Sequence, residues 1–154
     1  MTLEPEDVFL RLAAATAAGV IVGINRDLHN KPIGMRTLGL VALGTAVAAV
    51  AAIQFPGMAE NPDAASRVVQ GILQGIMAGI SFIGAGVILR DPKARVVEGL
   101  TTAATVWVTA ALGIACGLAA WVTVGLGLFL ALILLAVLPW IERLVTLRDK
   151  NGSS

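Results

Sequence analysis

Polar and charged side chains that could do chemistry lie at four points of a largely apolar sequence. These four polar points are the segments 25–27 (NRD), 35–37 (MRT), 80–86 (ISFIGAG) and 98–105 (EGLTTAAT). Carboxylate and hydroxyl oxygens are the ligands that hard cations prefer, so Asp27 and Glu98 are candidate metal ligands. Arg26 and Arg36 belong to the same set, so an anion or a lipid headgroup is an equally suitable guest. The residues expected to line one polar cavity are Asn25, Arg26, Asp27, Arg36, Thr37, Ser81, Glu98, Thr101, Thr102 and Thr105.

The residues that usually carry enzymatic chemistry are scarce. The single histidine, His29, has no cysteine or second histidine near it in the sequence, so spacing assembles neither a metal site nor a nucleophile with its base. One cysteine, Cys116, cannot form an intramolecular disulfide. We therefore expect no enzymatic activity and no cofactor, and the sparse basic residues give no reason to expect nucleic-acid binding.

The elements that position these residues are expected to be membrane-spanning helices. Hydrophobic residues make up 57% of the 154 positions and charged residues 14%, with a mean hydropathy of +0.87, whereas soluble domains are roughly half apolar and a quarter charged. Uncharged stretches near the ~20 residues that cross a bilayer as helix predict an all-α bundle of about five transmembrane helices. The predicted spans are 8–24, 37–55, 68–89, 100–115 and 118–141, with a tight break at Cys116 and Gly117.

The distribution of basic residues favours one direction of insertion. Most of them fall within the segments 26–36, 90–95 and 143–150, whereas Arg11 and Arg67 stand at the opposite ends of the spans. The positive-inside rule places those three segments in the cytoplasm, with the N-terminus outside and the C-terminus inside. All four polar points are then expected at the cytoplasmic end of the bundle.

Small residues recur every four positions on two spans. Gly19 and Gly23 follow this spacing on the first span, and Gly71, Gly75 and Gly79 follow it on the third. In a bilayer such stripes let helix backbones approach closely, and nearby glutamines can hydrogen-bond between helices. The residues predicted to pack helices, within the chain or across a homodimer, are Gly19, Gly23, Gln70, Gly71, Gln74, Gly75, Gly79, Gly84 and Gly86.

Four segments carry a resemblance to a known family. They are 19–26 (GVIVGINR), 33–37 (IGMRT), 70–88 and 98–107 (EGLTTAATVW). In this order they resemble the MgtC/SapB family of bacterial inner-membrane proteins, which implies a multi-pass transmembrane domain over 1–145 and a short cytoplasmic tail over 146–154. The family usually has Glu at the position of Asn25 and Gly at that of Ser81, so any role tied to that Glu does not transfer.

Two functions follow as hypotheses. The resemblance implies a link to magnesium limitation and virulence, and for the namesake members inhibition of the membrane ATP synthase. The chain would then be a regulatory protein, expected as a homodimer in the bilayer, that contacts another membrane complex such as ATP synthase. The alternative is a small channel or transporter whose cytoplasm-facing polar cavity binds an ion, a small solute or a lipid headgroup.

Overall fold

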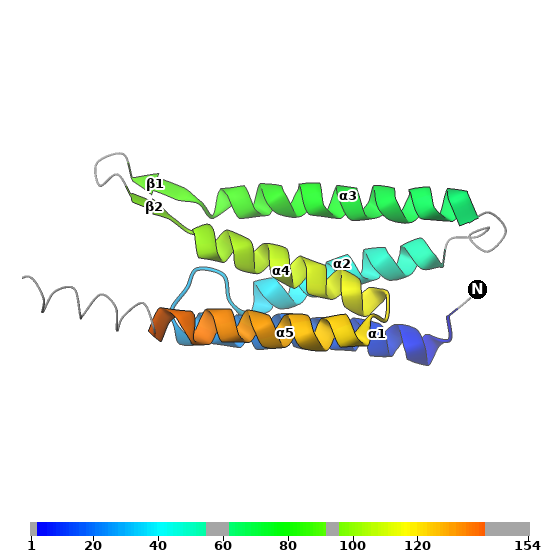
Figure 1. Ribbon diagram of the computed structural model, residues 1–154, viewed down its shortest axis with the longest axis horizontal. Coiled ribbons are helices and arrows are strands. Elements are labelled where there is room, and N and C mark those ends of the chain that lie inside the picture. The colour runs from blue at the N-terminus through cyan, green and yellow to red at the C-terminus, as the bar shows by residue number, and fades with distance from the viewer. Residues whose placement is uncertain (1–2, 55–61, 92–95, 141–154) are drawn as a thin grey trace, which may run out of the picture.

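The computed structural model describes residues 3–54, 62–91 and 96–140, and within these ranges five helices form a bundle (Figure 1). The helices are α1 (Pro5–Leu28), α2 (Met35–Ile53), α3 (Pro62–Gly86), α4 (Leu100–Gly117) and α5 (Trp121–Ala136). Each lies in a stretch long and apolar enough to cross a bilayer, the last one running over Trp121–Trp140. The predicted all-α bundle of transmembrane helices is therefore confirmed. The predicted tail, 146–154, lies outside the described residues. So does residue 141, the last residue of the predicted span 118–141.

The first helix is longer than the apolar stretch that predicts it. It begins at Pro5, where a proline and two acidic residues, Glu6 and Asp7, suit the first turn of a helix. It ends at Leu28 rather than at residue 24. The polar point around Arg26 is therefore part of the helix, and the helical geometry fixes the direction of its side chains.

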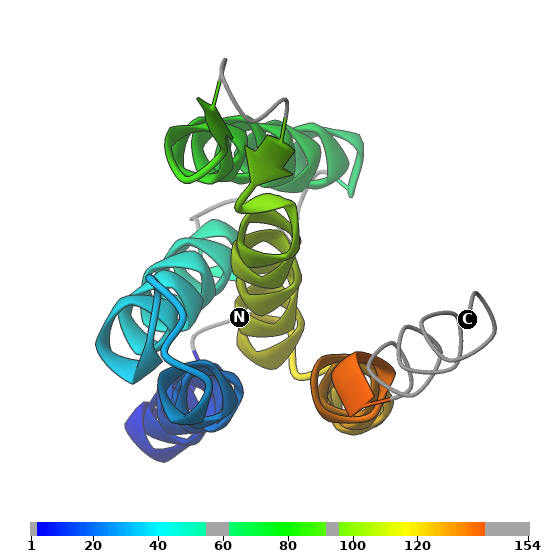
Figure 2. The same ribbon diagram turned by 90° about the vertical axis from the view of Figure 1, so that its left-hand side faces the viewer.

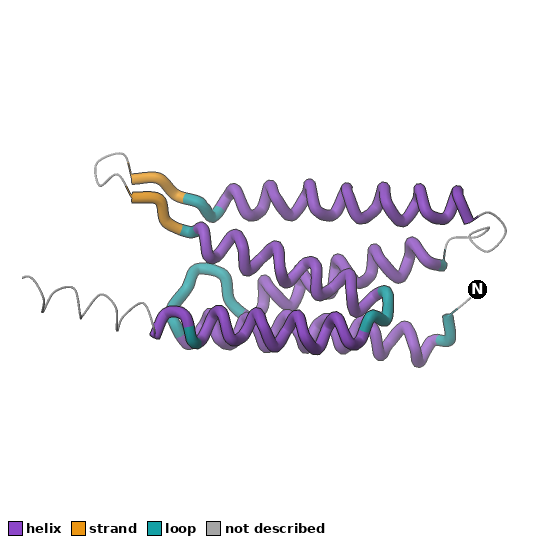
Figure 3. Tube along the Cα trace, viewed as in Figure 1, coloured by secondary structure: helices purple, strands orange, loops and turns teal. Residues whose placement is uncertain are grey.

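A short β-hairpin between α3 and α4 is an element that the sequence patterns do not predict. Strand β1 (Leu89–Asp91) pairs antiparallel with β2 (Val96–Glu98), and the two strands lie side by side in Figure 3. In this pairing Leu89 is the partner of Glu98. The predicted third span reached residue 89, but α3 ends at Gly86. β-Branched residues favour extended backbone, and Val96 with Val97 supplies them on β2.

The central helix is α4, which contacts each of the other four helices (Figure 2). Its contact with α2 is close, because small residues of the two helices face one another there. A Cβ at Gly113 would lie 2.9 Å from the Cα of Ala42, and one at Gly117 would lie 2.7 Å from the Cβ of Ala49. Backbones thus touch at this seam, as small residues allow in a bilayer.

Helices α3 and α5 lie at the periphery of the bundle. Half of the most apolar stretch of α2 and of α4 is buried, whereas the fraction is 11% in α3 and 6% in α5. Large apolar side chains such as Phe82 on α3 and Phe129 on α5 are exposed. These two helices therefore present most of their surface to lipid or to another protein.

One end of the bundle, here called the hairpin end, carries the C-terminus of α1, the N-terminus of α2, the β-hairpin and the N-terminus of α4 (Figure 1). All four polar points of the sequence lie near this end, as the alternation of spans predicts. The opposite end carries the N-terminus of α1 and the turn between α4 and α5. The assignment of the hairpin end to the cytoplasm remains a prediction.

Candidate functional site

Arg26 is a charged residue in the interior of the bundle. Its side chain lies on the last turn of α1 and is only 3% exposed. Its Nη2 donates a hydrogen bond to Oγ1 of Thr102, a buried residue on the first turn of α4. Its Nε is buried and has no acceptor. Among the residues that the structure describes, no carboxylate lies within ion-pair distance of this guanidinium.

Asp27, the next residue, has a separate partner. Its Oδ2 accepts a hydrogen bond of 3.1 Å from the backbone N–H of Met35, the first residue of α2. The residue at the N-cap of α2 is Gly34, which has no side chain to cap the helix itself. Asp27 therefore supplies from α1 the negative charge that a helix N-terminus favours.

The threonines of α4 divide into two kinds. Thr105 donates to the carbonyl of Thr101 at 2.7 Å, and Thr109 donates to that of Thr105 at 2.8 Å. Such bonds to the preceding turn satisfy a hydroxyl inside an apolar helix bundle without any partner from another helix. Thr102 differs because its oxygen accepts the hydrogen bond from Arg26.

Among the described residues, no side chain of the other predicted cavity residues is hydrogen-bonded to this pair. Ser81 is exposed on α3 and donates to the carbonyl of Met77 at 2.8 Å. The carbonyl of Asn25 lies 2.7 Å from Nδ1 of His29. The side chains of Arg36, Thr37, Glu98 and Thr101 are exposed. Within the described ranges, no three His, Cys, Asp or Glu residues come close enough together to hold a metal ion, and so Asp27 and Glu98 form no metal-ligand cluster there.

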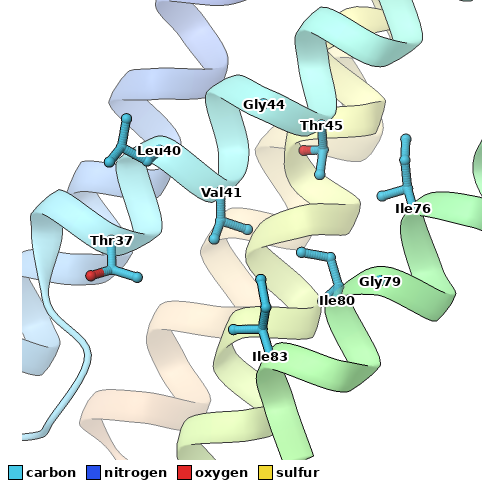
Figure 4. A pocket seen from close by; sticks show the side chains of 9 residues that line it. All are labelled: Thr37, Leu40, Val41, Gly44, Thr45, Ile76, Gly79, Ile80 and Ile83. Atoms are coloured by element: carbon cyan, nitrogen blue, oxygen red, sulfur yellow. The ribbon is translucent and has the colours of Figure 1, made fainter. Parts of the chain in front are cut away.

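An apolar groove of about 440 Å³ opens between α2 and α3 (Figure 4). Two threonines, Thr37 and Thr45, are its polar lining, and Thr37 is the member of the predicted cavity set that lies here. The other lining residues are Leu40, Val41, Gly44, Ile76, Gly79, Ile80 and Ile83. Because this lining is aliphatic, the groove suits an acyl chain or a helix side chain better than an ion.

The predicted packing residues separate into an inner and an outer group. Gly19 and Gly23 are buried against α2, and a Cβ at Gly19 would lie 2.9 Å from that of Ala42. Gly84 is in ordinary contact with α4. The outer group, at which a Cβ would meet no atom within 4 Å, is Gly71, Gly75, Gly79 and Gly86. The two glutamines, Gln70 and Gln74, are exposed.

Thr45 is a site residue that the sequence patterns missed. It is buried on α2, and its Oγ1 lies 3.1 Å from the carbonyl oxygens of both Ala42 and Ala110. The second contact joins α2 to α4. A lone threonine in an apolar span gives no signal of such a contact, because the spacing along one helix does not say which neighbour it faces.

The chain is similar in sequence to several known proteins. Protein SrpB of Synechococcus elongatus is 40% identical in an alignment of 145 residues that covers 90% of this chain and 79% of SrpB. Protein SapB of Bacillus subtilis is 37% identical over 144 residues, covering 89% of the chain and 59% of SapB. Protein MgtC of Salmonella typhimurium is 39% identical over 109 residues, covering 71% of the chain and 42% of MgtC. No solved structure matches the chain.

The chain thus spans most of SrpB but less than two thirds of SapB and of MgtC. The sequence profile of the MgtC family matches residues 12–144, which include all five helices for most or all of their length. The chain belongs to the MgtC family.

Proposed function

We propose that this protein is a membrane regulator that acts through contact between its helices and another membrane complex, and that α3 makes the contact. The observation that carries the proposal is a face of small residues on α3 that the described part of the chain does not cover. A Cβ placed at Gly71, Gly75 or Gly79 would meet no atom within 4 Å. Gly19 and Gly113, by contrast, are packed against α2.

The groove beside this face supports the same proposal. Gly79 lies both in the glycine face and in the lining of the groove between α2 and α3. A partner helix that lies along α3 would place its side chains in the groove and its backbone against the glycines. Close backbone approach at small residues is a main source of helix association in lipid.

Two exposed glutamines add polar contacts near the same face. Gln70 and Gln74 are one helical turn apart on α3. A side-chain amide facing hydrocarbon has unsatisfied donors and acceptors, so a hydrogen bond to a partner helix would stabilise the complex by about 0.6 kcal/mol. These residues would therefore help to set the register of a partner on α3.

The partner that we propose is the membrane sector of ATP synthase, in keeping with the resemblance to the MgtC/SapB family and with a role under magnesium limitation and during virulence. A homodimer through α3 is the competing occupant of this face. In either case the activity requires the protein to be a multi-pass membrane protein and requires no catalytic group. The transport alternative has less support, because the groove is aliphatic and Asp27 is hydrogen-bonded to the start of α2.

The experiment compares two glycines that are equally open but lie on different helices. Gly75 on α3 and Gly125 on α5 are both exposed, and a Cβ at either would meet no atom within 4 Å. Leucine is placed at each position, and membranes containing each variant are cross-linked and solubilised before the bound proteins are identified. Proton-driven ATP synthesis is measured in vesicles from the same cells.

We expect Gly75→Leu to lose the cross-link to the partner and the effect on ATP synthesis, while Gly125→Leu retains both. A cross-link to a second copy of the chain in place of ATP synthase would assign α3 to the homodimer and reject the proposed partner. Identical behaviour of the two variants would reject α3 as the contact surface.

A further inference from the structure

We infer that Arg26 and the N-terminus of α4 form a binding site for a phosphate group. The site lies inside the bundle, between the last turn of α1 and the first turn of α4. It is distinct from the exposed face of α3 on which the proposed function rests, so the two proposals can fail independently.

The first argument is the unpaired charge of Arg26. Arg26 is only 3% exposed. Its guanidinium has five N–H donors, and among the described residues it donates to one acceptor, Oγ1 of Thr102. Its buried Nε has no acceptor. A buried cation without an anion is costly by several kcal/mol in the low dielectric of a protein interior, so an anion is expected beside it.

The second argument is the positive helix end to which this side chain points. The N-terminus of α4 has no side-chain cap and no acidic residue in its first turn, and its N-cap residue is Gly99. Helix N-termini carry a partial positive charge and free N–H groups. Arg26 therefore adds a full positive charge to a site that is already positive, and a bound anion would offset the cost of placing these charges together.

The neighbouring helix shows the opposite arrangement and serves as an internal comparison. The N-terminus of α2 receives the carboxylate of Asp27, which accepts from Met35 N at 3.1 Å. Glu98 is the acidic residue closest in sequence to the start of α4, and its side chain is exposed and makes no described contact with Arg26. Asp27 thus neutralises one helix end, whereas no carboxylate among the described residues is hydrogen-bonded to the other.

The chemistry of the donors favours phosphate. Guanidinium presents a planar fork that binds phosphate oxygens in pairs, and helix N-termini bind the same group through backbone N–H donors. Leu100 and Thr101, the first residues of α4, are exposed. The site lies at the end of two membrane-spanning helices, where a phospholipid headgroup and a free phosphate ion are both within reach.

The experiment measures thermal stability of the delipidated full chain in detergent, because a ligand that binds the folded state raises the melting temperature. One arm adds inorganic phosphate and the other adds phosphatidylglycerol, each compared with sodium chloride at equal ionic strength. Native mass spectrometry counts the phospholipids that remain bound. Stabilisation in the first arm alone identifies a free anion, and stabilisation in the second alone identifies a lipid headgroup. Either result supports the site, and stabilisation in neither arm overturns it.

Variants distinguish ligand binding at Arg26 from a general effect of the protein's positive charge. Arg26→Gln is expected to weaken binding of the stabilising ligand about tenfold or more, because it removes charge-assisted hydrogen bonds. The variant should then need about ten times more phosphate or phosphatidylglycerol for the same rise in melting temperature. Two controls with the same substitution, Arg36→Gln at the exposed start of α2 and Arg67→Gln at an exposed position near the start of α3, are expected to respond within twofold of the parent. If Arg26→Gln does not fold, Arg26→Lys replaces it and is expected to weaken the response severalfold. An unchanged response in the Arg26 variant tested overturns the inference.

Discussion

The Nη1 of Arg11 donates a hydrogen bond of 2.9 Å to the carbonyl oxygen of Gly117, a residue 106 positions further along the chain. Its Nη2 pairs with Oδ2 of Asp7 at 2.7 Å, and the two residues are one helical turn apart, a spacing that favours such a pair. A single side chain near the start of α1 therefore holds the last residue of α4, where the turn to α5 begins. The tertiary contact was not predictable from spacing, whereas the local one was.

Replacement of Arg11 by methionine is expected to lower the free energy of unfolding by about 1.5–3 kcal/mol, because the carbonyl of Gly117 loses a charged donor. Asp7→Asn keeps that donor and removes an ion pair between i and i+4 residues, so it is expected to cost only about 0.3–0.5 kcal/mol. Reversible unfolding in mixed micelles, followed by circular dichroism, measures both. The exposed Arg67→Met is the control, and an equal loss in it and in Arg11→Met would contradict the assignment.

Much of the fold could be predicted because few kinds of protein structure can span a bilayer. Apolar stretches of the required length gave the five helices, and the alternation of spans placed Arg26 and Thr102 at the same end. The hydrogen bond between these two residues could not be predicted, because they are 76 positions apart and the rotation of each helix about its axis depends on its neighbours.

The two glycine stripes show the same limit. Gly19 and Gly23 have the spacing of Gly75 and Gly79, but the first pair is packed against α2 and the second faces outward. Periodicity identifies a smooth helix face and does not say what covers it. The hairpin was missed for a different reason: its strands have three residues each, too few for any alternation to stand out in the sequence.

The link between Arg26 and Thr102 predicts a strong dependence on the hydroxyl group. Thr102→Val preserves the shape of the side chain and removes the described acceptor of Arg26, so it is expected to lower the free energy of unfolding by about 1.5–3 kcal/mol. Thr102→Ser keeps the oxygen and is expected to cost less than half of that. Thermal unfolding in detergent compares the two with Thr101→Val, which alters an exposed neighbour. Equal stability of the valine variants would show that the hydrogen bond contributes nothing.

Thr45 predicts a smaller effect. Its hydroxyl joins α2 to α4 through the carbonyl of Ala110 at 3.1 Å, and hydrogen bonds between membrane helices contribute about 0.6 kcal/mol on average. We expect Thr45→Val to lower the free energy of unfolding by about that amount. Ser81→Ala is the matched control, because this exposed hydroxyl bonds only within its own helix, to Met77 at 2.8 Å. An equal change in the free energy of unfolding for Thr45→Val and Ser81→Ala would show that the hydrogen bond from α2 to α4 adds no stability.

Alanine should destabilise the fold at Gly113 but not at Gly125. A Cβ at Gly113 would lie 2.9 Å from the Cα of Ala42, an atom of the backbone that cannot rotate away. Gly113→Ala is therefore expected to force α4 from α2 and to destabilise the fold by about 1–3 kcal/mol. At Gly125 the same Cβ meets no atom within 4 Å, so the higher helix propensity of alanine, worth up to about 1 kcal/mol, should raise stability or leave it unchanged. The difference in unfolding free energy between the two variants, measured under the same micelle conditions, isolates backbone contact from helix propensity. If Gly113→Ala were as stable as Gly125→Ala, α2 and α4 would not be in backbone contact at this seam.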